Sequence, residues 1–154
     1  MKRVLVLVAA ILTFSIGTAT AQILKPVTWK ISVKKVSEGV YDVVCQATID
    51  AKWHLYDTKL SEGGPIPTTF NLDTDESDGI ELVGEFKATT KPLIEKSEAF
   101  NMELAYFEGK VTLVQRVKLT KAKAKLVGYV EFMSCNDGQC IPPAEEEFEF
   151  ELEK

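Results

Sequence analysis

Two cysteines near the end of the chain carry the chemistry that this sequence suggests most directly. Cys135 and Cys140 flank Asn136-Asp137-Gly138-Gln139, whose Asp-Gly pair is typical of a tight turn. We therefore expect the two cysteines to face each other across the mouth of a β-hairpin. Opposed residues of an antiparallel pair have Cα atoms about 4.5–5.5 Å apart, and a disulfide tolerates roughly 4.4–6.8 Å. The bond can form there, and thiol–disulfide exchange is the chemistry it would offer.

The third cysteine, Cys45, is predicted to be a core residue. It lies between Val43 and Ala47 on the apolar side of a predicted strand, where a thiol behaves as a small hydrophobe. Three cysteines are an odd number, so at least one thiol is unpaired or is used between molecules.

The residues alone leave the role of the pair open. In the chain-entropy model a Cys135–Cys140 bond contributes about 2 kcal/mol, whereas bonding Cys45 to either partner would close a loop of about 90 residues and contribute roughly 4.6 kcal/mol. If the disulfide served only to stabilise the fold, a bond that closes the longer loop would be favoured. A structural bond and a redox-active bond both remain possible roles for the pair.

Acidic residues lie near the pair in the sequence. Asp137 and the run 145–147, all glutamate, place negative charge close to Cys140, and negative charge disfavours a thiolate. We expect Cys140 to react selectively, with partners that bring positive charge or a good leaving thiol.

The elements that must position these residues are strands. The mature part of the chain consists of short runs rich in Val, Ile, Thr, Phe and Tyr, separated by polar turns, without a 3.6-residue periodicity. The spacing of the runs predicts an all-β fold, an immunoglobulin-like antiparallel β-sandwich. The expected strands are Thr28–Val36, Val40–Asp50, His54–Thr58, Thr68–Leu72, Ile80–Phe86, Lys110–Leu119, Lys125–Met133 and Glu146–Leu152.

The first residues predict export. Met1–Ala21 combines Lys2 and Arg3 with an apolar run and a small-residue end, which is the pattern of a cleaved signal peptide. We expect a single domain over residues 22–154, located in the periplasm and monomeric. The formal net charge of the 154 residues is −5, which argues against nucleic acid as a partner.

No other residue type forms a recognisable catalytic or metal site. His54 is the sole histidine, and one imidazole without ligand spacing is a poor zinc site, so it is interpreted as structural or exposed. The acidic segment Asp73–Gly79 lacks the glycine and the distal glutamate of a calcium loop. We expect no cofactor and no metal.

Several segments together resemble the N-terminal domain of DsbD-type thiol:disulfide interchange proteins. The resemblance spans nearly all of the chain after the signal peptide, and the final Cys-Ile-Pro-Pro element is its most specific part. The matching segments are Lys52–Tyr56, Gly63–Phe70, Tyr106–Leu113 and Phe132–Pro143.

The resemblance implies a role for three residues. Cys135 and Cys140 would be the redox centre, with Cys140 forming the mixed disulfide and Cys135 resolving it. A cap segment at Ser97–Met102 would shield the pair with Phe100, although Asn101 stands where the family pattern has a second aromatic.

The resemblance also implies partners. Electrons would come from a membrane electron-transport protein of DsbD type, acting in trans because the chain ends at Lys154, and would pass to periplasmic thioredoxin-like or disulfide isomerase proteins. The alternative from a different class is a non-catalytic exported protein-binding module with a structural Cys135–Cys140 disulfide.

Overall fold

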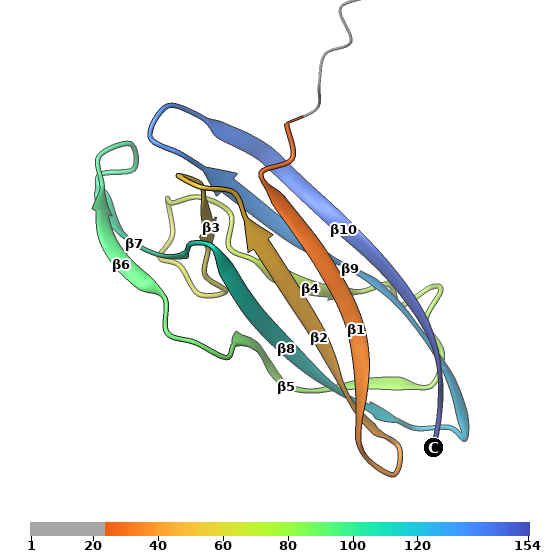
Figure 1. Cartoon of the computed structure of the whole chain (residues 1–154). Helices are drawn as coiled ribbons and strands as arrows, with labels where there is room; N and C mark the ends of the chain where they lie inside the picture. The colour runs from red at the N-terminus through yellow and green to blue at the C-terminus, as the bar shows by residue number, and fades with distance from the viewer. Residues whose placement is uncertain (1–23) are drawn as a thin grey trace, which may run out of the picture.

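The fold is an immunoglobulin-like antiparallel β-sandwich, as the sequence predicted. The computed structural model describes residues 24–154, and the predicted signal peptide lies outside this range. Every pair of neighbouring strands is antiparallel, and the strands form two layers (Figure 1). They are β1 (Val27–Ser37), β2 (Val40–Ile49), β3 (His54–Tyr56), β4 (Thr69–Leu72), β5 (Ile80–Ala88), β6 (Leu93–Ser97), β7 (Met102–Phe107), β8 (Lys110–Leu119), β9 (Lys123–Cys135) and β10 (Cys140–Glu153).

One layer is the four-stranded sheet β1-β2-β8-β5. The turn between β1 and β2 uses Gly39 with φ of +66°, a conformation that glycine adopts without steric cost. Cys45 in β2 lies opposite Leu113 in β8. All three inner neighbours along β2, Val43, Cys45 and Ala47, are buried, so the alternation expected from the sequence is confirmed.

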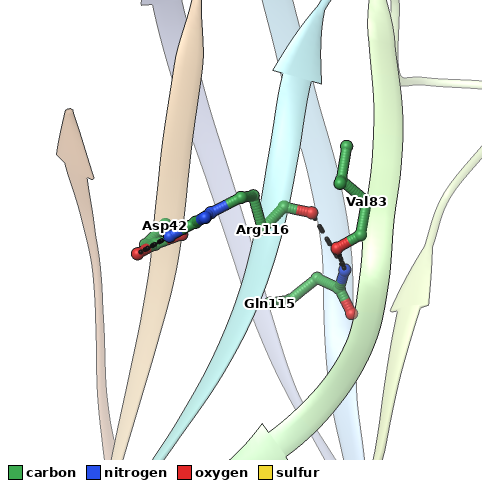
Figure 2. A network of polar contacts seen from close by, with 4 residues as sticks. All are labelled: Asp42, Val83, Gln115 and Arg116. Carbon is green, nitrogen blue, oxygen red and sulfur yellow. Dashed lines mark hydrogen bonds and ion pairs between the residues drawn. The ribbon is translucent and has the colours of Figure 1, made fainter. Parts of the chain in front are cut away.

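A polar network supports the irregular edge of this sheet, where β5 slips out of register with β8 between Val83 and Lys87. Figure 2 shows the buried Gln115 side chain donating from Nε2 to the carbonyl oxygens of Val83, at 3.2 Å, and of Arg116, at 2.9 Å. These bonds satisfy a buried amide that would otherwise cost free energy. On the other side of β8, Arg116 pairs with Asp42 of β2 through two contacts of 2.8 and 3.0 Å.

The second layer has the order β10-β9-β3-β7-β6, with β4 also paired to β9. The long strand β9 pairs along one side with β10 and along the other with β4 and then β3. Gly128 makes this crowding possible: a Cβ atom there would lie 2.2 Å from the Asn71 carbonyl oxygen of β4. The cysteine end of β9 therefore lies between β10 and β3.

The core fills the space between the layers. Leu55, Leu113, Leu126, Val117 and Val130 have no measurable exposure, and burying an aliphatic side chain of this size contributes about 1.5–3 kcal/mol. A smaller satellite cluster contains Tyr56, Leu104, Tyr106 and Cys135. Within residues 24–154 no helix is long and apolar enough to cross a membrane.

The sequence missed two strands and placed the start of another too late. β6 and β7 were not predicted, because Leu93 and Ile94 of β6 are both exposed at a sheet edge and so show no alternation. β10 begins at Cys140 rather than at Glu146. Pro142 and Pro143 look like a loop in sequence, but they occupy a shift of register between Ile141 and Ala144 on an edge strand, where proline is tolerated.

Candidate redox site

Cys135 and Cys140 close the β9–β10 hairpin and are bonded to each other. They are direct partners in the register, with Cα atoms 4.0 Å apart, which is closer than the sequence predicted. The loop between them is tied by a bond from the Asn136 backbone N–H to the Gln139 oxygen, at 2.9 Å. The Asn136 side chain accepts bonds from Gly138 and Gln139, both at 2.9 Å. The turn thus holds the two sulfur-bearing residues together.

The two cysteines differ sharply in exposure. Cys135 is only 4% exposed and belongs to the satellite cluster, whereas Cys140 is exposed on the edge strand β10. A second molecule can therefore contact Cys140 more readily than Cys135.

The residues after Cys140 keep the strand edge from pairing further. Pro142 and Pro143 have no backbone N–H and lie in the bulge opposite Met133. Bulges and prolines at an edge hinder addition of another strand. A partner approaching Cys140 therefore meets a strand edge that is poorly suited to β-augmentation.

The predicted cap segment forms the turn between β6 and β7. Phe100 is half-buried there and packs against the cluster that holds Cys135. The Phe100 backbone N–H donates a hydrogen bond of 3.4 Å to Ser97 Oγ. The turn and the β9–β10 loop lie at the same end of the sandwich (Figure 1). Together they line a cavity of about 420 Å³ that includes Phe100, Cys135 and Cys140. Phe100 therefore packs beside Cys135, while Cys140 is exposed.

Polar side chains that sequence reasoning did not assign to the site line the same cavity. The Tyr106 hydroxyl donates to Glu95 Oε2 at 2.7 Å, and this carboxylate raises the pKa of Tyr106 to about 12. His54 stacks on the Tyr106 ring, with centroids 4.2 Å apart, and its Nε2 lies 3.0 Å from Glu108 Oε1. The signal that would have found them is the missed strand β7, which carries Tyr106 and ends just before Glu108.

Cys45 takes no part in this arrangement. It is a free cysteine with no measurable exposure, and it lies in the other sheet. Burial raises the pKa of its thiol to about 12, so the thiol stays protonated and inert at neutral pH. The prediction that Cys45 is a core residue is confirmed.

Comparison with known proteins identifies relatives of the same fold. The N-terminal domain of DsbD from Neisseria meningitidis in its reduced form has a TM-score of 0.51 and 16% identity, covering 82% of this chain and 86% of that one. The same type of domain in a complex with the PilB N-terminal domain from Neisseria meningitidis gives 0.51 and 17%, with 83% and 87% covered. The N-terminal periplasmic domain of ScsB from Proteus mirabilis gives 0.59 and 15%, with 87% and 49% covered.

The sequence itself gives the family. No curated protein matched the chain at the threshold applied, but residues 20–152 match the family described as thiol:disulfide interchange protein DsbD, N-terminal. That match spans most of the chain and agrees with the fold of the solved structures. The chain belongs to the DsbD N-terminal domain family, and its bonded cysteine pair makes it a thiol–disulfide exchange module.

Proposed function

We propose that this protein passes electrons through Cys135 and Cys140 in the periplasm, from a membrane reductase acting in trans to other exported oxidoreductases. The observation that carries the proposal is the asymmetric pair: a disulfide at a sheet edge with one exposed and one buried cysteine. We further propose that Met1–Ala21 is a signal peptide and that residues 22–154 act as a single monomeric domain.

The exchange takes place in two balanced steps. In the reduced protein, the Cys140 thiolate attacks a partner disulfide, forming a mixed disulfide and releasing one partner thiolate. The Cys135 thiolate then attacks the Cys140 sulfur, so the Cys135–Cys140 bond forms and the second partner thiolate leaves. Two electrons reach the partner, and the membrane reductase restores the dithiol by the reverse sequence.

The similar structures support this cycle. One describes a DsbD N-terminal domain in its reduced form, and another describes such a domain in complex with the PilB N-terminal domain. A related domain that is reduced in one case and bound to a partner in another is what an electron carrier requires. For this chain we propose thioredoxin-like or disulfide isomerase proteins as acceptors.

Single-cysteine variants test the proposed roles. In a Cys45→Ala background, Cys135→Ala is expected to form a stable mixed disulfide with a purified, oxidised thioredoxin-like protein, because Cys140 attacks and nothing resolves the product. Cys140→Ala serves as the matched control and is expected to form little, because Cys135 is buried. Equal trapping by both variants, or trapping by neither, would contradict the assigned roles.

A further inference from the structure

A row of three side chains crosses the second sheet at the redox site. His54 in β3 lies directly opposite Cys135 in β9, and Cys135 lies directly opposite Cys140 in β10. Opposed residues of antiparallel strands point to the same face, with Cβ atoms about 4.5–5.5 Å apart. All three line the same cavity. The imidazole is therefore the cross-strand neighbour of the buried sulfur.

His54 is held by its neighbours on the far side of the row. Its side chain is 22% exposed, stacks on Tyr106 and places Nε2 3.0 Å from Glu108 Oε1. A carboxylate at one ring nitrogen favours the tautomer with the proton there, which leaves Nδ1 as an acceptor. Enzymes commonly activate a nucleophile with a neighbouring base that a third group holds in place. Cys135, His54 and Glu108 are arranged in this order.

The surroundings of Cys135 make such a base useful. Cys135 is only 4% exposed, and burial and nearby negative charge are the conditions in which a thiol loses its proton least readily without a base. Glu95, Glu98 and Asp137 line the cavity together with Lys96 and His54, and Glu108 lies beside His54. The phenols Tyr56 and Tyr106 have raised pKa values. His54 is the sole histidine of the sequence, and an imidazole is the side chain that most often serves as a general base.

We propose that His54, oriented by Glu108, is the base that accepts the Cys135 proton in the resolving step. The inference rests on the proposed function and specifies how its second step proceeds. The proton moves from Cys135 Sγ to the imidazole, and the thiolate attacks Cys140 Sγ in the mixed disulfide. The Cys135–Cys140 bond forms, the bond to the partner breaks, and the imidazolium returns the proton to the departing thiolate.

The test separates the two steps of exchange in one experiment. Reduced protein is mixed rapidly with dithiobis(nitrobenzoate), an aromatic disulfide that releases a coloured thiolate. The first equivalent reports attack by Cys140, and the second reports resolution by Cys135. Cys135→Ala identifies the phases because it retains only the first. The second phase is then followed between about pH 5 and 8.

The expected result is a selective change in the second phase. His54→Gln should slow it about a hundredfold near neutral pH, within the range typical of general base catalysis. The remaining rate should then rise with pH in step with the Cys135 thiolate fraction. Glu108→Gln should slow it less, because the base remains but loses its orienting carboxylate. Glu149→Gln is the matched control, since that carboxylate pairs with Lys125 away from the cavity, and it should behave as the unaltered protein.

The outcomes distinguish the inference from the function it deepens. If both phases occur and His54→Gln leaves the rate and pH dependence of the second unchanged, the inference is overturned while the exchange function stands. A first phase slowed as much as the second also overturns it, because His54 then acts on the whole site. If the unaltered protein releases no thiolate while folded, the proposed function itself fails.

Discussion

Cys135 and Cys140 share one bond yet lie in different environments. The first is packed against Tyr56, Leu104 and Tyr106, and the second is open to solvent. Because an attacking cysteine must be accessible and a resolving cysteine need not be, this difference is the residue-scale basis for the two roles that we propose.

Phe100 carries the next prediction at this scale. Removing its ring with Phe100→Ala should let glutathione reduce the disulfide faster, because the ring packs against the cluster that holds Cys135. Stability should fall by about 1–3 kcal/mol, less than for a fully buried phenylalanine. The reduction rate and the urea midpoint are the measurements.

A second half-buried phenylalanine provides the control. Phe86 packs against the main core away from the cavity, so Phe86→Ala should lower stability without changing the rate of reduction in the folded protein. If Phe100→Ala leaves that rate unchanged, the shielding role is wrong and Phe100 is a packing residue only.

The residues of the site are positioned by strands. How well each strand could be predicted from the sequence depended on its environment in the fold. The Asp-Gly turn correctly located the β9–β10 hairpin, and the alternation of apolar residues around Cys45 correctly placed it on the buried side of β2. β6 was not predicted because it is an exposed edge strand. β7 was not predicted because it buries Leu104 and Tyr106 in a satellite cluster away from the main core. The cap segment was predicted only from the family resemblance. The partners of His54 depend on cross-strand register, which a sequence does not specify.

Gly128 is the element-scale requirement for the second sheet. Gly128→Ala would place Cβ 2.2 Å from the Asn71 carbonyl oxygen and 2.9 Å from the Phe148 ring. We expect a loss of about 2–4 kcal/mol in the free energy of unfolding, since backbone must move. Gly138→Ala is the matched control, because its nearest contact is Asn136 Oδ1 at 3.7 Å. Equal urea midpoints for the two variants would contradict this account.

The Asp42–Arg116 pair between β2 and β8 predicts a pH dependence (Figure 2). The Arg116 guanidinium, which bonds the carboxylate, holds the pKa of Asp42 below its usual 3.8. The pair's contribution is therefore present above that value and is lost as the pH falls through the lower pKa of the folded state. Because the pair is partly exposed, we expect at most about 1 kcal/mol.

Paired denaturation curves check this expectation. Asp42→Asn should be less stable than the unaltered protein at about pH 7, and the difference should shrink toward about pH 2. Glu85→Gln, which breaks the exposed pair with Lys59, should change stability little at either pH. A constant difference for Asp42→Asn across the range would contradict the electrostatic explanation.

In the molecule as a whole, the redox site lies at one end of the sandwich. The β9–β10 loop and the β6–β7 turn occupy one end, and the chain terminates at the opposite end (Figure 1). A partner can approach the site end-on while both sheets remain intact. Cys45 lies inside the core with its pKa raised to about 12, so exchange at the surface pair does not involve it.

The reduction potential of the pair in the folded protein is the most direct test. The protein is equilibrated with dithiothreitol and glutathione buffers, alkylated, and mapped by mass spectrometry. We predict that Cys135 and Cys140 titrate together above about −300 mV, while Cys45 stays protected. A pair that resists reduction until the domain unfolds would show that the bond is a structural staple, and the exchange function would be abandoned in favour of a binding module.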